Sequence, residues 1–188
     1  HEIKNPLTPI QLSAERLRRK YLKKMPKEES EILDRSTHII VEQVAAMKEM
    51  VNAFSDYARS PDMEISSTNV ATLMREIIDL YKEQETNISI SFSIDSEDLM
   101  FDVDPGRIRQ IMHNLIRNSI EAISEADNGK INIAAKQVNT DEITMIEIRV
   151  EDSGCGFDKE SLGQIFDPYV TSKSKGTGLG LAIVKKLV

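Results

Sequence analysis

The first six residues, HEIKNP, combine a histidine with a carboxylate and a proline. The ring nitrogen of His1 is a nucleophile that titrates near neutral pH, so it can accept a phosphoryl group, and Glu2 can orient the ring or take its proton. Pro6 and Pro9 lack amide protons and crowd earlier carbonyl groups, so a helix that runs through them is expected to bend near His1. The alternative is a helix that begins at Pro6 with Asn5 as its N-cap.

Two asparagines, Asn114 and Asn118, lie four residues apart in a segment with the pattern of a long helix. Side chains at this spacing share one face of a helix. Their amide oxygens suit a hard cation such as Mg²⁺ that is also held by nucleotide phosphates. The alternative interpretation is a pair of ordinary surface asparagines.

Residues 151–157, EDSGCGF, place a carboxylate beside two glycines at the end of an expected strand. Gly154 and Gly156 permit close backbone approach or unusual dihedral angles. Asp152 can accept a hydrogen bond from an exocyclic amine such as that of adenine. The same residues also suit a simple tight turn.

A second glycine-rich motif, GTGLGL, leads into an apolar helical stretch and is preceded by Lys173 and Lys175. The spacing of Gly176, Gly178 and Gly180 allows backbone amides and a helix N-terminus to meet phosphates. Because the motif does not follow a strand, a dinucleotide-binding fingerprint is the poorer interpretation.

Two apolar repeats in the N-terminal third predict the elements that must position His1. Both repeats advance by alternating steps of about four and three residues, and the polar stretch 25–29 between them contains Pro26, so the pattern predicts a helical hairpin. Two helices bury little apolar surface alone, so we expect two copies to form a homodimeric four-helix bundle. The repeats consist of Ile3, Leu7, Ile10, Ala14, Leu17 and Tyr21, and of Ile40, Val44, Met47, Val51, Phe54 and Ala58.

The stretch 60–69 loses the helical period, contains Pro61 and ends in polar residues that can cap a helix. It is therefore expected to be a linker, with the domain boundary near residue 65. The remaining sequence has an α/β pattern whose last two strands are expected to be antiparallel, with helices covering one face of the sheet. Helices are expected over 70–85 and 105–126, and strands over 88–94, 130–138 and 143–151.

The composition fits a globular segment of a longer protein. The 188 residues are 40% hydrophobic and 29% charged, and they contain no apolar run long enough to cross a membrane. The net charge of −7 argues against a primary role in nucleic-acid binding. The single cysteine, Cys155, cannot form an internal disulfide, which fits a reducing cytosol. Because the sequence begins with histidine, we expect it to be a segment of a longer protein.

In their order and spacing, these motifs resemble the sensor histidine kinases of two-component systems. HEIKNP resembles the H box, NLIRN the N box, DSGCG the first glycine box, IFDPYVTSK the F box and GTGLGLAIV the second glycine box. The stretch HEIKNPLTPIQLSAERLRRKY is especially similar to the NtrY-type nitrogen-regulation sensors. The resemblance implies an α+β architecture: a dimerisation and phosphotransfer hairpin over residues 1–62, followed by a Bergerat-type α/β sandwich that binds ATP over residues 66–188, without its last strands.

The resemblance also implies roles for the N-terminal motif and the asparagines. His1 would be the phosphoacceptor and Glu2 its acid/base partner. Asn5 would position water for removal of phosphate from a receiver domain. Asn114 and Asn118 would hold Mg²⁺ on the triphosphate.

For the rest of the nucleotide site, the resemblance implies that Asp152 recognises adenine and that Gly154 and Gly156 shape its pocket. Residues 158–175 would form a mobile ATP lid with Phe166 as its anchor. The residues expected near the phosphates are Lys173, Gly176, Gly178 and Gly180.

The implied reaction is autophosphorylation from ATP, followed by transfer to an aspartate of a response regulator, with phosphatase activity toward that regulator as a further expectation. The segment is expected in the cytoplasm, in a parent protein anchored in the inner membrane. Two other functions fit part of the pattern. An ATP-driven conformational clamp would have no need of the HEIKNP hairpin, and a catalytically silent dimerising scaffold would be free to lose Asn114, Asn118 and Asp152.

Three residues depart from the usual pattern of the family. Tyr169 stands where phenylalanine is frequent, Ser119 where alanine is frequent, and Cys155 at a variable position. All three are interpreted as tolerated packing variants, with Cys155 as a small, semi-buried filler rather than a redox-sensitive thiol. The two other histidines, His38 and His113, are interpreted as surface or packing residues.

Overall fold

The structure, a computed structural model, describes residues 4–58, 62–82, 87–123, 128–140, 143–171, 173 and 176–188. The chain divides into two compact units: residues 1–60 with 171–179, and residues 61–170 with 180–188. Within the described residues, no helix combines the length and the apolar character needed to cross a lipid bilayer.

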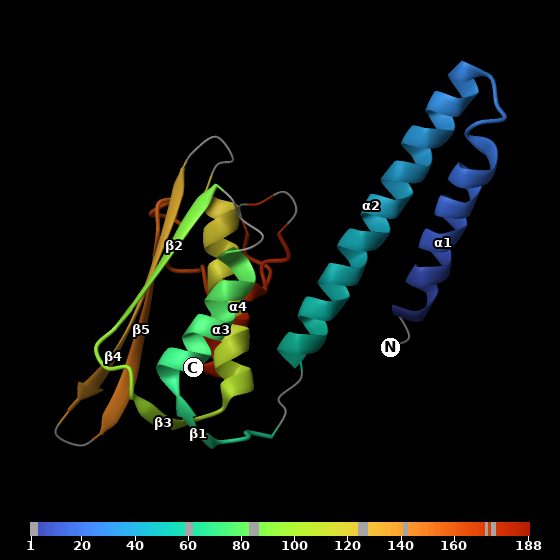
Figure 1. Cartoon of the computed structure of the whole chain (residues 1–188). Coiled ribbons are helices and arrows are strands. Elements are labelled where there is room, and N and C mark those ends of the chain that lie inside the picture. The colour runs from blue at the N-terminus through green and yellow to red at the C-terminus, as the bar shows by residue number, and fades with distance from the viewer. Residues whose placement is uncertain are drawn as a thin grey trace. The chain divides into compact units, whose positions relative to one another are not determined.

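The first unit contains the predicted helical hairpin (Figure 1), formed by α1 (Lys4–Tyr21) and α2 (Lys27–Ala58). Polar contacts join the helices: Arg18 Nε lies 2.6 Å from Asp34 Oδ1, and Lys48 Nζ donates to Gln11 Oε1 at 2.7 Å. Helix α1 already includes Lys4 and Asn5, so the alternative in which the helix begins at Pro6 is wrong.

The apolar repeats of the hairpin separate into a buried set and an exposed set. Leu7, Ala14 and Val44 are buried, and Thr37, seven residues before Val44, is buried with them. The second set, which we call the open seam, is between 42% and 51% exposed and consists of Ile10, Leu17, Ile40, Met47 and Phe54. This is the pattern expected of half of a larger helical bundle.

The second unit is an α/β sandwich. Its main sheet has the strand order β2-β4-β5, and its members are β2 (Ile88–Ile94), β4 (Gly129–Asn139) and β5 (Thr144–Asp152). Strand β4 runs antiparallel to β5, as predicted, and parallel to β2. Helices α3 (Val70–Lys82) and α4 (Pro105–Ala122) cover one face of this sheet (Figure 1), and α5 (Gly180–Leu187) packs against α4.

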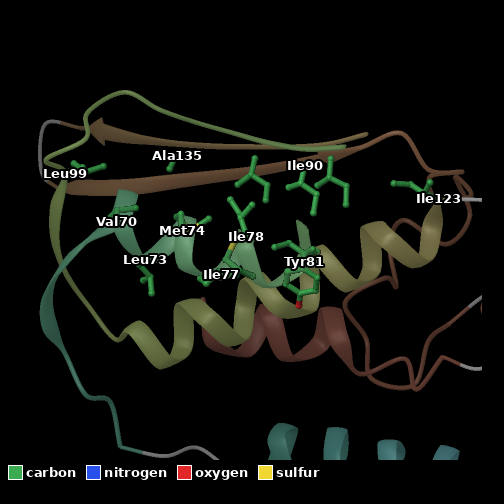
Figure 2. Close-up of a cluster of buried hydrophobic side chains, with 14 residues drawn as sticks. Val70, Leu73, Met74, Ile77, Ile78, Tyr81, Ile90, Leu99, Ile123 and Ala135 are labelled. Atoms are coloured by element: carbon green, nitrogen blue, oxygen red, sulfur yellow. The ribbon is translucent and has the colours of Figure 1, made fainter. Parts of the chain in front are cut away.

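The core of the second unit lies between the sheet and helices α3 and α4. Figure 2 shows labelled side chains of this core, such as Met74, Ile78 and Ile90, between the strands and the helices. Alternate residues of β4 face the helices, because successive side chains of a strand point to opposite faces. The fully buried aliphatic side chains of this core are Met74, Ile78, Met112, Ile116, Ile131 and Ile133.

A second, two-stranded sheet was not predicted. Strand β1 (Ser66–Asn69) pairs antiparallel with β3 (Met100–Val103), with Ser66 opposite Val103. The sequence of β1, SSTN, has no apolar alternation and lies in the stretch interpreted as linker, so only its tertiary partner makes it a strand.

Asp104, which follows β3, holds the start of α4 in place. Its Oδ1 accepts from the Arg107 amide at 3.1 Å, as expected of an N-cap, and its Oδ2 accepts from the Glu64 amide at 3.0 Å. These hydrogen bonds, first the one from Glu64, lower the pKa of the Asp104 carboxyl below its ordinary value.

Candidate functional site

Helix α4 positions the two predicted metal ligands. Met112, Ile116 and Ser119 are buried on one side of this helix, so Asn114 and Asn118 lie half-buried on the adjoining face. The Asn114 Nδ2 group donates to the Gln110 carbonyl at 2.8 Å. This bond fixes the amide group and leaves its Oδ1 as the available acceptor.

Both asparagines meet the first residue of α5. A Cβ atom added at Gly180 would lie 3.3 Å from Asn114 Oδ1, 3.4 Å from Asn118 Nδ2 and 3.6 Å from Asn118 Oδ1. The N-terminus of a helix carries partial positive charge and unpaired amides. The structure therefore brings amide oxygens together with a helix N-terminus, an arrangement that suits a metal-bound anion.

Asp152 lies at the end of β5 and is held from two sides. Ser119 Oγ donates to its Oδ2 at 3.1 Å, and the Gly154 amide donates to its Oδ1 at 2.9 Å. The Asp152 side chain is nevertheless exposed, so its oxygens can still accept hydrogen bonds from a ligand. The two donors fix the orientation of this carboxylate next to α4.

Ser119 has a role that the sequence did not reveal. The residue is only 4% exposed, and its hydroxyl group donates a hydrogen bond to Asp152. The interpretation of Ser119 as a packing variant is therefore incomplete. Its partner lies 33 residues away in the sequence, and no local pattern connects the two.

The two glycines of the turn after β5 serve the two purposes that the sequence predicted. A Cβ at Gly154 would lie 2.7 Å from Ala122 Cβ and 2.8 Å from the Ala122 carbonyl carbon and oxygen, so close approach to the end of α4 excludes a side chain. Gly156 has φ 70°, a conformation that glycine adopts readily. The Cys155 amide donates to the Ala122 carbonyl at 3.2 Å, but its side chain is exposed, so the prediction of a semi-buried filler is wrong.

The segment after Gly156 exposes many of its large apolar side chains. Tyr169 has φ 67° and is 60% exposed, so it is not a packing residue as predicted. Phe166, the expected anchor, is 42% exposed. The other exposed apolar residues of this segment are Phe157, Leu162 and Val170.

Part of the glycine-rich motif before α5 forms a tight local structure. A Cβ at Gly176 would lie 2.5 Å from Thr171 Oγ1, and the Gly176 amide donates to the Lys173 carbonyl at 3.2 Å. Gly178 has φ 66°. The close approach at Gly176 and the left-handed backbone at Gly178 explain why this motif needs glycines at these two positions.

Several predicted residues lie elsewhere in the chain. His1 and Glu2 lie outside the described residues, as does Lys175, whereas Asn5 is exposed on α1 in the first unit. His113 is hydrogen-bonded to Tyr81 of α3, as expected of a packing residue. The structure therefore brings together Asn114, Asn118, Gly180, Asp152 and Gly154 along α4.

The chain matches two protein families in succession. Residues 1–62 match the His Kinase A (phospho-acceptor) domain, and residues 103–188 match the histidine kinase-, DNA gyrase B-, and HSP90-like ATPases. A helical hairpin followed by an ATPase module of this type is the architecture of a histidine kinase core.

The comparisons with individual proteins also identify histidine kinases as relatives of this chain. The chain is 36% identical over 193 residues to nitrogen regulation protein NtrY of Azorhizobium caulinodans, an alignment that covers 100% of this chain and 24% of that protein. The nucleotide-free catalytic domain of histidine kinase ThkA matches with a TM-score of 0.59 and 38% identity, over 66% of this chain and 80% of that one. ThkA in complex with response regulator protein TrrA matches with a TM-score of 0.68 and 31% identity, over 100% of this chain and 52% of that one.

The chain therefore belongs to the sensor histidine kinases and carries their phospho-acceptor and ATPase modules. Within this family it is similar over its whole length to NtrY, and it spans about a quarter of that protein.

Proposed function

We propose that this chain is the catalytic core of a sensor kinase that phosphorylates His1 from ATP and passes the phosphoryl group to an aspartate of a response regulator. The observation that supports the proposal most directly is the arrangement along α4. Asn114 and Asn118 meet Gly180, and Asp152 is held by Ser119, the residue that follows Asn118 on this helix. Residues 1–62 would supply dimerisation and phosphotransfer, and residues 66–188 would bind ATP.

Asp152 is the proposed contact for adenine. Its two oxygens each accept one hydrogen bond from the protein, and each keeps a lone pair for a ligand. An exocyclic amine is a donor that matches such a group. Gly154 lets the turn pass close to α4, and Gly156 supplies its left-handed backbone. We propose that the two glycines thereby shape the adenine pocket.

The cluster of Asn114, Asn118 and Gly180 fits Mg²⁺ and phosphates. Amide oxygens are ligands that Mg²⁺ accepts when phosphates and water complete its octahedron, and Asn114 and Asn118 offer two of them on one helix face. When bound, Mg²⁺ would neutralise charge on the triphosphate. Gly180 at the N-terminus of α5 adds backbone amides. Lys173 of the proposed lid, and Gly176 and Gly178 after it, would approach the same phosphates.

In the proposed reaction, a ring nitrogen of His1 forms a bond to the γ-phosphorus while the bond to the β–γ bridging oxygen breaks and ADP leaves. Glu2 would orient the imidazole and take its proton. The phosphoryl group would then pass to a receiver aspartate, and Asn5, exposed on α1, would position water for its later hydrolysis. The solved complex of ThkA with TrrA supports a response regulator as the partner.

The open seam supports a homodimer. The five apolar side chains of the open seam are exposed in the single chain, and a second copy would bury them in a four-helix bundle. The proposed setting is a cytoplasmic segment of a membrane-anchored sensor.

Two rival functions are less well supported. A conformational clamp would explain the ATPase module but not the phospho-acceptor match over residues 1–62. A silent scaffold would explain the hairpin but not the preserved geometry of Asn114, Asn118 and Asp152.

The test is incubation of the full-length protein with γ-labelled ATP and Mg²⁺, followed by measurement of the label's stability in acid and alkali. We expect acid-labile, alkali-stable label that is lost in His1→Gln. His38→Gln is the matched control, because His38 is an exposed histidine of the same hairpin and its Nε2 lies 3.5 Å from a carboxylate oxygen of Glu42. Label that persists in His1→Gln and disappears in His38→Gln would show that His38, and not His1, is the phosphoacceptor. Nucleotide binding without any label would favour the clamp or the scaffold.

A further inference from the structure

Ser119 stands out among the described residues because it is a buried polar side chain within the proposed nucleotide site. It follows Asn118 on α4, is 4% exposed, and donates to Asp152 Oδ2 at 3.1 Å. A buried hydroxyl without a partner is costly, so this position favours a conformation in which the hydroxyl bonds to Asp152. Ser119 therefore links the helix of the metal ligands to the carboxylate proposed to bind adenine.

With the hydrogen bond from Ser119, both carboxylate oxygens of Asp152 are bound by donors of the protein. The Gly154 amide binds the other oxygen at 2.9 Å, so rotation of the carboxylate would break both bonds. With Gly154 alone, the carboxylate would be held at one oxygen. The hydroxyl thus removes a rotational freedom that a ligand would otherwise have to restrict on binding.

A carboxylate fixed in this way distinguishes between purine bases. It accepts hydrogen bonds and donates none, so it matches the 6-amino group of adenine. The 6-carbonyl group of hypoxanthine or guanine at the same place would bring two acceptors together. A site built for a hydrogen-bond donor discriminates strongly against analogues that lack it.

We propose that Ser119 is a positioning residue that holds Asp152 toward the base and thereby contributes to the selection of 6-aminopurine over 6-oxopurine nucleotides. The inference rests on the proposed function, because it requires Asp152 to contact the base.

The experiment compares the affinities of the full-length protein for ATP and for inosine triphosphate, which carries a 6-carbonyl group, in the presence of Mg²⁺. In Ser119→Ala we expect ATP affinity to fall about three- to tenfold, the range for one lost hydrogen bond, while inosine triphosphate affinity changes less than about twofold. Ser119→Cys, which keeps a weak donor of similar size, is expected to lie between wild type and Ser119→Ala. This variant also preserves the test if the alanine variant folds poorly.

Ser91→Ala is the matched control. Ser91 Oγ also donates to a side-chain oxygen, Asn132 Oδ1 at 2.7 Å, but on the exposed face of the sheet. Its ATP affinity is expected to equal that of wild type. In an Asp152→Asn background, Ser119→Ala is expected to have a much smaller effect on ATP affinity, because the two residues act as one unit.

The outcomes separate the two proposals. If wild type binds ATP and Ser119→Ala binds it equally well, or loses affinity for both nucleotides by the same factor, Ser119 does not select the base. If wild type itself does not bind ATP, the proposed function fails, and the inference fails with it.

Discussion

The two units of this chain differ in how they bury their apolar residues. The second unit encloses a core between a sheet and two helices, with Met112, Ile116 and Ile131 fully buried. The hairpin buries one apolar set, including Leu7 and Val44, and leaves the open seam exposed. The second unit therefore has the core of an independently folding domain, whereas the hairpin has an exposed seam that the proposed dimer would cover.

The difference has a functional consequence. A closed core fixes α4 firmly, and α4 carries the residues that would bind nucleotide. If the proposed dimer covers the open seam, the stability of the hairpin depends on its partner, and association and phosphotransfer are located in the same unit. The loss of stability caused by a substitution should therefore depend on protein concentration in the hairpin and be independent of it in the second unit.

The largest effect is expected for Ile116→Ala. Ile116 is fully buried in the second unit, and truncation of such a side chain costs about 2–5 kcal/mol of the free energy of unfolding. Chemical denaturation monitored in the second unit should show this loss at every protein concentration. A loss below about 0.5 kcal/mol would mean that this core is not closed.

Gly154→Ala should disturb the contact between the turn after β5 and the end of α4. The added Cβ would lie 2.7–2.8 Å from Ala122, including its backbone, so the turn must shift, at a cost of about 1–3 kcal/mol. We expect weaker ATP binding and a lower melting temperature. Gly163→Ala is the control, because a Cβ there meets no atom within 4 Å. Equal behaviour of the two variants would contradict the close approach.

Phe54→Ala tests the open seam. Phe54 is 51% exposed in the single chain, and its truncation should weaken a dimer by about 1–2 kcal/mol per chain. Sedimentation equilibrium should show more monomer, and the melting temperature should depend more strongly on concentration. Leu12→Ala is the control, since Leu12 is 59% exposed on α1 but lies outside the seam. A dimer that weakens only in the control would place the interface elsewhere.

The smallest effect concerns pH. The Glu64 and Arg107 amides lower the pKa of Asp104 in the folded state, so its carboxylate stabilises the fold above the unfolded pKa of about 3.9. This contribution is lost as pH falls through the lower, folded pKa. The stability advantage of wild type over Asp104→Asn should be constant from about pH 5 to 7 and shrink below about pH 4.

Denaturation at several pH values measures this advantage, with Asp102→Asn, an exposed neighbour on β3, as control. An advantage that is the same at about pH 2 as at neutral pH would show that the charge of Asp104 is not its source.

Regular patterns in the sequence predicted most of the elements. The strand over residues 88–94 and the start of α4 at Pro105 agree with the prediction, because alternating residues and a proline after a capping aspartate are local signals. Strand β1 was missed because SSTN carries no such signal and is a strand only through its pairing with β3. The parallel pairing of β2 with β4 likewise depends on the packing of the whole sheet.

The candidate site likewise combines features that local sequence patterns predict with contacts that depend on the tertiary structure. The order of the motifs that contain Asn114, Asn118, Asp152 and the glycines, and their resemblance to the histidine kinase boxes, predicted a nucleotide site. Residue types and local spacing alone left an ordinary helix surface and a simple turn as alternatives. The sequence could not show that Gly180 lies beside both asparagines, that Gly154 contacts Ala122, or that Ser119 holds Asp152. Those contacts join residues far apart in the chain, and only the packing of α4, α5 and β5 around one core brings them within reach.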